Sequence, residues 1–393
     1  MTTVEPRGGL ESAATAPRPR FACFDGLRAI AATAVIVQHV GFQTGASYRY
    51  RTLGPFLARM DSGVSLFFLI SGFLLYRPFV AANLSSRPRP TTGGFYRRRA
   101  FRIFPAYWFA LTFTALFMGL KLRGVSGGLH FYSLTQIYTT RDHLYLRGIN
   151  QAWSLATEIS FYLFLPVYAW VISRLSARRT PERRWIVELA GLVVIGVGGA
   201  GFRAFVDLGQ PSWHTIGIYW LPSYLDLFAI GMMLALLQVA VREGAVGRVT
   251  ATIGRHPAIC WLLGAATFWA VAELAGLPRG LETVSGGREL LKHALYGTAA
   301  FFLLLPAVFG PENHGRIRRW LQWRPVAYVG VVSYGVYIWH EALLGQLLRW
   351  VGTPLFLGNF YAYLLGTFVF SVAVAAVSWQ FVERPIVAWA RRR

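Results

Sequence analysis

Stretches of about twenty predominantly apolar residues recur along the whole chain, and they constrain its fold more than any other feature. Such a stretch is long enough to cross the hydrocarbon core of a bilayer as an α-helix. Only 14% of the 393 residues are charged, whereas soluble proteins carry about a quarter charged residues. Alternating ten-residue strands are absent from the sequence, which argues against a membrane β-barrel. The sequence predicts an all-α integral membrane protein, a multi-pass protein of the inner (cytoplasmic) cell membrane embedded in the lipid bilayer.

Ten transmembrane spans fit the sequence. Their approximate bounds are 24–43, 60–80, 103–121, 151–173, 185–205, 217–240, 257–276, 291–310, 326–349 and 359–381. With the N-terminus inside, the inner segments hold 26 Lys and Arg residues and the outer loops hold 12, while Arg28 lies within the first span. Cytoplasmic loops of membrane proteins carry an excess of positive charge. A bundle of about ten transmembrane helices with both termini cytoplasmic is therefore predicted.

Three segments are expected along the chain. Residues 1–22 form a polar, disordered cytoplasmic tail, residues 23–385 form one transmembrane domain, and residues 386–393 form a basic cytoplasmic tail. The formal net charge is +22, but the arginines cluster in short loops between apolar blocks, which is typical of membrane orientation. No nucleic-acid partner is therefore expected. No zinc-type Cys/His spacing occurs in the sequence, so no metal site is expected.

An arginine and a histidine, Arg28 and His39, interrupt the first apolar span. On an α-helix these two residues lie on the same face, about 16 Å apart along the axis. Ionisable residues in membrane helices are costly, and they usually face a bundle interior or a water-filled cavity on a functional pathway. The alternative is structural: Arg28 extends to a lipid headgroup, and His39 is a satisfied interior polar group.

A run of arginines precedes the third span. Arg99 and Arg102 are three residues apart and share a helix face. Several guanidinium groups at one membrane boundary suit a polyphosphate, because arginine offers planar, bidentate donors. The alternative is a barrier to translocation with attraction to anionic lipid. This alternative fits Arg97 and Arg98 better than Arg102, which lies among large apolar residues.

Two further polar clusters lie in later spans. Trp153 can belong to an interfacial aromatic belt, but Glu158 lies inside the fourth span, where an acid needs a partner or a task. His340 and Glu341 lie past the middle of the ninth span, where an interfacial location is the alternative to a catalytic role. Cations at the inner boundary and proton-carrying groups farther out fit a reaction between an inner anionic donor and an outer neutral acceptor. An anion channel also fits.

These stretches resemble the membrane-bound acyltransferase 3 family, which includes glycan O-acetylases and macrolide acyltransferases. The resemblance runs from about Phe24 to Pro385 and rests on five motifs in order. They are Asp25-Gly26-Leu27-Arg28 with His39 eleven residues after the arginine, Phe67-Phe68-Leu69-Ile70-Ser71-Gly72-Phe73, Arg99-x-x-Arg102-Ile103-x-Pro105, Trp153-Ser154-Leu155-x-x-Glu158-x-x-Phe161-Tyr162, and Ser333-Tyr334-x-x-Tyr337-x-Trp339-His340. Two positions depart from the family pattern: Ser65 replaces a common acid, and Glu341-Ala342 follows His340 where a proline is common.

The resemblance implies transfer of an acyl group, commonly acetyl from cytoplasmic acetyl-CoA, to a hydroxyl group. It makes Arg28, Arg99 and Arg102 functional, and we expect these arginines to hold the phosphates of the acyl-CoA donor. It also makes His39 functional. We expect His39 to be the general base, because a neutral imidazole accepts a hydroxyl proton near neutral pH.

Roles for three other residues follow less directly. Glu158 is expected either to orient His39 or to bind acceptor hydroxyl groups. Trp153 and His340 are expected to contact the acceptor. We rank direct transfer ahead of a covalent acyl-enzyme formed through His39 or Ser71, because the sequence shows no evident pair of nucleophile and base.

The acceptor is expected to be a hydroxyl-bearing glycan or glycolipid of the cell envelope or extracellular space. A macrolide or another secondary metabolite is the alternative acceptor. A membrane exporter of a glycan or antibiotic is the alternative from a different functional class, in which the buried Arg, His and Glu residues line a substrate pathway. The sequence shows no internal repeat of the kind that many transporters contain, and this disfavours the exporter.

Overall fold

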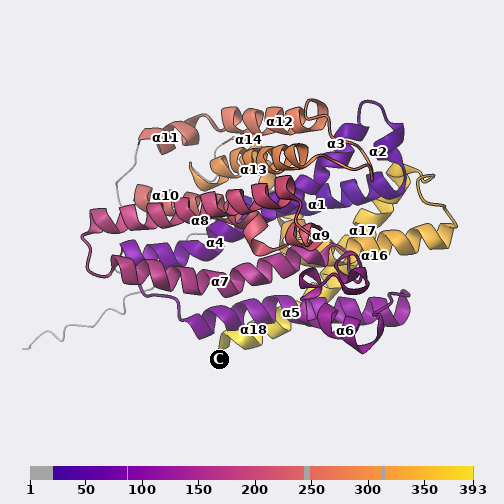
Figure 1. The fold of residues 1–393 in the computed structure, drawn as a ribbon, viewed down its shortest axis with the longest axis horizontal. Coiled ribbons are helices and arrows are strands. Elements are labelled where there is room, and N and C mark those ends of the chain that lie inside the picture. The colour runs from indigo at the N-terminus through magenta and orange to yellow at the C-terminus, as the bar shows by residue number, and fades with distance from the viewer. Residues whose placement is uncertain (1–20, 86, 243–247, 311–314, 393) are drawn as a thin grey trace, which may run out of the picture.

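The computed structural model describes residues 21–85, 87–242, 248–310 and 315–392. Within these ranges the chain is built of helices and connecting turns and contains no β-strand. Figure 1 shows the long helices running side by side along the long axis of the molecule, with α12 and α13 on one side and α5 and α18 on the other. The predicted tail 1–22 lies outside the described residues except for its last two positions.

Eight helical segments are long and apolar enough to cross a membrane. They contain the helices α1 (Cys23–Gln43), α4 (Gly63–Leu84), α5 (Thr92–Phe117), α7 (Ala152–Ser176), α8 (Pro181–Gly209), α10 (Leu225–Arg242), α13 (Gly286–Val308) and α17 (Phe360–Ser378). The two remaining expected spans overlap a shorter apolar helix, α12 (Pro257–Glu273), and α16 (Ser333–Val351), which carries His340, Glu341 and Arg349. The all-α membrane fold is confirmed, while the cytoplasmic placement of both termini stays a prediction.

Shorter elements connect these helices. They are the α-helices α2 (Ala46–Arg49), α3 (Gly54–Arg59), α6 (Gly124–Ser133), α9 (His214–Gly217), α11 (Arg248–Arg255), α14 (Arg316–Leu321), α15 (Arg324–Val331) and α18 (Arg384–Arg392), the 3-10 turns η1 (Met60–Ser62), η2 (Gln136–Tyr138), η3 (Arg141–Leu146) and η4 (Leu221–Tyr224), and the π-helical turn η5 (Trp379–Glu383). The segment predicted as a basic tail, 386–393, is mostly helical, because η5 continues from α17 into α18.

Close backbone approach between α4 and α10 sets the centre of the bundle. A Cβ atom at Gly72 would lie 2.3 Å from the carbonyl oxygen of Phe228, and one at Gly231 would lie 2.1 Å from that of Leu69. Small residues permit such close helix packing in membranes, where van der Waals contact rather than hydrophobic burial drives association. Helix α1 packs against α4, α15, α16 and α17, so the helix that carries Arg28 and His39 lies inside the bundle.

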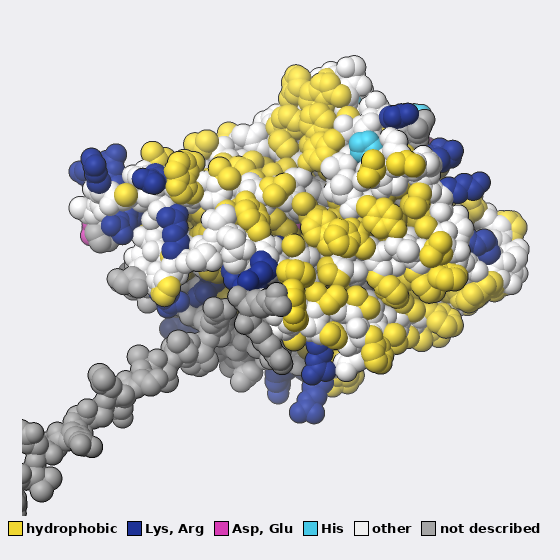
Figure 2. Space-filling view, turned by 90° about the horizontal axis from the view of Figure 1, so that it is seen from below, with side chains coloured by type: hydrophobic (Ala, Val, Ile, Leu, Met, Phe, Trp, Pro, Cys, Tyr) yellow, Lys and Arg dark blue, Asp and Glu magenta, His cyan; other side chains and the backbone are white. Residues whose placement is uncertain are grey.

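The exposed apolar side chains of the protein fit a lipid environment. Figure 2 shows a broad face of hydrophobic side chains with Lys and Arg mainly at its margins. Leu116, Phe117 and Leu262 are about 70% exposed, and many other large apolar side chains are also exposed. Soluble monomers rarely present contiguous apolar patches of more than a few hundred Å², whereas lipid tails cover such a surface without cost.

Candidate active site

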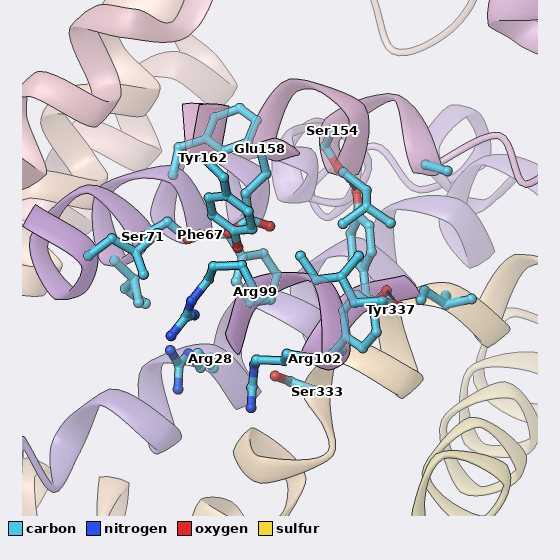
Figure 3. A pocket seen from close by; sticks show the side chains of 18 of the residues that line it. Arg28, Phe67, Ser71, Arg99, Arg102, Ser154, Glu158, Tyr162, Ser333 and Tyr337 are labelled. Carbon is cyan, nitrogen blue, oxygen red and sulfur yellow. Dashed lines mark hydrogen bonds between the residues drawn. The ribbon is translucent and has the colours of Figure 1, made fainter. Parts of the chain in front are cut away.

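A cavity of about 310 Å³ lies among α1, α4, α5, α7, α16 and α18. Arg28 of α1 and the two arginines of the third-span motif, Arg99 and Arg102 of α5, line it together. Figure 3 shows these three side chains gathered on one side of the cavity, while Ser154 and Tyr337 lie on another. Arg98 also lines the cavity and is exposed. The cavity therefore reaches the protein surface at its arginine end.

Helix α5 begins earlier than expected from hydropathy, at Thr92 rather than near 103. The arginine run is therefore part of the helix itself, and the three-residue spacing turns Arg99 and Arg102 toward the same cavity. The Tyr334 hydroxyl donates a 2.8 Å hydrogen bond to the carbonyl oxygen of Ile103. This contact holds α16 against α5 beside the paired arginines.

The arginine end carries more cationic than anionic groups. Arg28 makes an ion pair with Asp25 at 3.4 Å, one turn earlier on α1. The Nε atom of Arg99 is buried and has no hydrogen-bond partner within the described part of the chain. Buried polar groups are almost always hydrogen-bonded, so this unsatisfied donor indicates a place for a hydrogen-bond acceptor, and the surrounding arginines favour an anionic one. Of the residues predicted from sequence to bind the donor, all three line this cavity.

Glu158 lies on the same cavity, not beside His39. The Ser71 hydroxyl donates a 2.5 Å hydrogen bond to its Oε1 atom. His39 is not among the described residues that line this cavity. The expectation that Glu158 orients His39 therefore finds no support in the geometry, and Glu158 instead places one acidic group among the arginines.

His39 pairs with His340, 301 positions later in the chain. The Nε2 atom of His340 lies 3.0 Å from Nδ1 of His39. Nδ1 of His340 lies 2.7 Å from the carbonyl oxygen of Tyr337, and Nδ1 of His39 lies 3.1 Å from that of Val35. His340 is fully buried, whereas 19% of the His39 side chain is exposed.

The hydrogen bonds of this pair assign the positions of the ring protons. A backbone carbonyl oxygen can only accept, so Nδ1 of His340 carries a hydrogen and donates it to Tyr337. Nε2 of neutral His340 is then an acceptor, and Nδ1–H of His39 donates to it and to Val35. Nε2 of neutral His39 is left with its lone pair, as a general base requires.

The carboxylate beside this base is Glu341. Its Oε2 atom lies 4.0 Å from Nε2 of His39 and has no hydrogen-bond partner among the described residues. A gap of 4.0 Å is too long for a direct hydrogen bond, but a water molecule between the two atoms can bridge it by donating one hydrogen to each. Glu341 thus lies beside His39, where one of the two alternatives for Glu158 would have placed that residue.

The two residues expected to contact the acceptor are placed differently. Both ring nitrogens of His340 are occupied, so its contacts orient His39 and leave no polar atom for a substrate. The Trp153 ring lies 5.2 Å from the ring of Tyr219 and 5.5 Å from that of Tyr224, and it does not line the arginine cavity. Its observed contacts belong to an aromatic cluster.

Gln151 was not identified from the sequence, although it stands only two residues before Trp153, where the fourth-span motif begins. It lines the cavity at the end away from the arginines, near Ser154 and Tyr337. The hydroxyl groups of Ser154 and Tyr337 lie 2.7 Å apart. Glutamine at the start of a helix has no distinctive spacing, so only the fold reveals its position.

Within the described ranges, no group of three or more His, Cys, Asp or Glu side chains lies close enough together to hold a metal ion.

Comparison with known proteins places these motifs in context. Residues 21–380 match the model of a family described as an acyltransferase domain. The chain is 23% identical to nodulation protein 10 of Rhizobium leguminosarum bv. viciae over 349 residues, which cover 82% of this chain and 81% of that protein. No solved structure matches the chain.

Two further relatives are longer than this chain. O-acetyltransferase OatA of Staphylococcus aureus is 23% identical over 92% of this chain and 56% of its own length. A putative peptidoglycan O-acetyltransferase, YrhL of Bacillus subtilis, is 25% identical over 92% of this chain and 54% of its own length. The chain thus spans slightly more than half of each of these two proteins.

Proposed function

Because this chain belongs to the family whose acyltransferase domain model matches residues 21–380, it is an enzyme that transfers acyl groups, and we propose that it O-acetylates a glycan while embedded in the membrane. The donor in this proposal is acetyl-CoA, or another acyl-CoA, in the cytoplasm. The acceptor is a hydroxyl group of a cell-envelope or extracellular glycan or glycolipid. The name of one relative, an O-acetyltransferase, supports the choice of an acetyl group, and the name of another, a putative peptidoglycan O-acetyltransferase, supports the choice of a glycan acceptor.

The observation that carries the proposal is the convergence of Arg28, Arg99 and Arg102 on one membrane cavity. Coenzyme A carries several phosphate charges, and arginine binds phosphate oxygens with paired, charge-assisted hydrogen bonds. The unsatisfied Nε atom of Arg99 offers one such donor. Since the cavity opens at this end, the phosphates lie at the arginines and the acyl thioester extends inward.

The cavity volume fits this division of the donor. About 310 Å³ is at the small end of ligand pockets, so the cavity holds the narrow pantetheine arm while the nucleotide stays nearer the surface. The inner part of the cavity, near Ser154 and Tyr337, receives the thioester. Fixing the two reactants in this way supplies up to about 7–11 kcal/mol of the barrier reduction.

His39 is the general base of the proposed reaction. Its Nε2 atom removes the proton of the acceptor hydroxyl as the hydroxyl oxygen attacks the thioester carbonyl carbon. The carbon–sulfur bond then breaks, and the coenzyme A thiolate takes the proton from the His39 imidazolium to leave as a thiol. General base catalysis of this kind contributes roughly 10²–10⁴ in rate.

The test is acetyl transfer by the purified protein in lipid vesicles. Labelled acetyl-CoA is supplied with cell-envelope glycan, and label in the glycan is measured for the wild type and for His39→Gln. Wild-type transfer with loss in a folded His39→Gln variant supports the proposal. Absence of wild-type thioester consumption with every glycan offered, or full activity of His39→Gln, contradicts it.

A further inference from the structure

A second cavity, of about 220 Å³, adjoins the arginine cavity. It lies between the end of α5, the segment 148–150 and the outer half of α16. Glu341 and Arg349 of α16 line it together with Asn150. Gln151 and Ile149 line both cavities. Gln151 therefore stands in the wall between the two.

Hydrogen bonds fix the orientation of the Gln151 amide. The residue is only 3% exposed, and its Nε2 atom donates to the carbonyl oxygens of Tyr337 at 3.0 Å and Ile338 at 2.8 Å. Both amide hydrogens are thereby used. The Oε1 atom is buried and has no hydrogen-bond partner in the described chain. An amide oxygen can only accept, so its missing partner must be a donor.

The second cavity contains another unsatisfied acceptor. The Oε2 atom of Glu341 also lacks a hydrogen-bond partner in the part of the chain that the structure describes, and Glu341 lines the same cavity as Gln151. A ligand that satisfies both oxygens must bring at least two hydrogen-bond donors. Neighbouring hydroxyl groups of a sugar ring meet this requirement, whereas a largely apolar acceptor leaves one oxygen unpaired.

We propose that the second cavity is an acceptor subsite for one hydroxyl-rich sugar unit and that Gln151 separates it from the arginine cavity, which binds the acyl donor. In this proposal the Oε1 atom of Gln151 accepts a hydrogen bond from the sugar. The inference rests on the proposed function and names the part of the acceptor that this enzyme recognises. A volume of about 220 Å³ is smaller than drug-sized ligand pockets. One sugar unit therefore occupies the subsite, and the remainder of a glycan stays outside.

The position of Gln151 also protects the thioester. Closed sites exclude water and so prevent hydrolysis of reactive groups. In the absence of acceptor, the Gln151 side chain blocks the path from the second cavity to the bound thioester. Its amide also holds the Tyr337 carbonyl, the same group that accepts from His340. Gln151 thus links acceptor recognition to the orientation of the histidine pair.

Two substitutions separate the proposed roles. Gln151→Met keeps most of the side-chain volume but removes the amide, that is, the oxygen together with the N–H donors to Tyr337 and Ile338. The KM for the acceptor therefore rises roughly two- to tenfold, while acceptor-free hydrolysis of acetyl-CoA does not increase, because the wall between the cavities stays filled. Gln151→Ala opens the wall, so the acceptor KM rises and acceptor-free hydrolysis increases. Gln136→Ala is the matched control, because Gln136 is 2% exposed, its Oε1 atom has no partner among the described residues, and it lines neither cavity.

The assay uses labelled acetyl-CoA, the protein in lipid vesicles, and methyl hexopyranosides with their monodeoxy analogues as acceptors. The wild type should acetylate at least one methyl glycoside and discriminate against one deoxy analogue, and Gln151→Met should lose that discrimination. The inference is overturned if the variants match Gln136→Ala in both readouts. It is also overturned if the wild type acetylates cell-envelope glycan but no methyl glycoside, or treats all deoxy analogues alike.

The wild-type measurements keep the test decisive if the Gln151 variants do not fold. Failure of the proposed function has a different signature, in which the wild type consumes no acetyl-CoA with any acceptor.

Discussion

Nε2 of His340 lies 3.0 Å from Nδ1 of His39, and this contact fixes which nitrogen of His39 is free to act as a base. His340 is itself held by the carbonyl oxygen of Tyr337. The resulting chain of hydrogen bonds runs from the backbone of α16 through two imidazole rings to Nε2 of His39. A residue in the ninth predicted span thus determines the chemistry of a residue in the first.

His340→Phe should lower kcat by on the order of 10²-fold, because misplacement of a catalytic group by about 1 Å has this effect. The KM for the acceptor should change little, since neither ring nitrogen of His340 is available to a substrate. Steady-state kinetics with varied acceptor separate the two parameters. A variant with normal kcat and a raised acceptor KM would show instead that His340 binds the acceptor, the role first expected from the sequence.

Arg99→Ala and Arg102→Ala should raise the KM for acetyl-CoA about 10- to 100-fold, since hydrogen bonds to charged groups contribute about 1.5–3 kcal/mol. The loss should be smaller with a donor that lacks one phosphate, such as 3′-dephospho-acetyl-CoA. Arg97→Ala is the matched control, because Arg97 is exposed on the same helix and does not line the cavity. Normal donor affinity in both cavity variants would rule out phosphate binding at this site.

Ser71→Ala distinguishes direct transfer from a covalent acyl-enzyme. Ser71 donates a hydrogen bond to Glu158 in the arginine cavity. The sequence alone did not reveal this pairing of a hydroxyl group with a carboxylate. Direct transfer predicts that Ser71→Ala keeps activity within about tenfold of the wild type, as loss of one hydrogen bond allows. Abolished activity, together with an acetylated Ser71 peptide found by mass spectrometry of the wild type, would establish the covalent route.

Cysteine labelling tests the predicted orientation. The native cysteines, Cys23 and Cys260, are buried at 4% and 7% exposure, so they contribute little background. In intact cells a membrane-impermeant maleimide should label Val125→Cys, in a predicted outer loop, but not Ala177→Cys, in a predicted inner loop. Both positions are exposed in the fold, so the reverse labelling pattern would invert the orientation.

The helices themselves were predictable from the sequence, because a bilayer requires long apolar segments and each such segment forms its own backbone hydrogen bonds. Counting of positive charges also placed Arg28 at the same boundary as Arg99 and Arg102, and these three residues line one cavity. Helix periodicity alone predicted that Arg28 and His39 lie on one face of the first span.

Contacts between distant helices were not predictable in the same way. Glu158 and Glu341 are both acids within spans, and no periodicity in the sequence indicates which of them lies beside His39. The structure places Glu341 there and Glu158 beside Ser71. The position of Gln151 between two cavities likewise depends on how α7 and α16 pack, which is a property of the assembled bundle.

Acetyl transfer in sealed vesicles tests the central claim most directly. Labelled acetyl-CoA is supplied only on the face that carries the predicted cytoplasmic loops, and label is measured in a glycan acceptor. We predict covalent label in the acceptor with the wild type and a 10²–10⁴-fold lower rate with His39→Gln, while both proteins show the same thermal unfolding. Equal rates for the two proteins, or thioester consumption that never labels the acceptor, would contradict the proposed reaction and the role of His39.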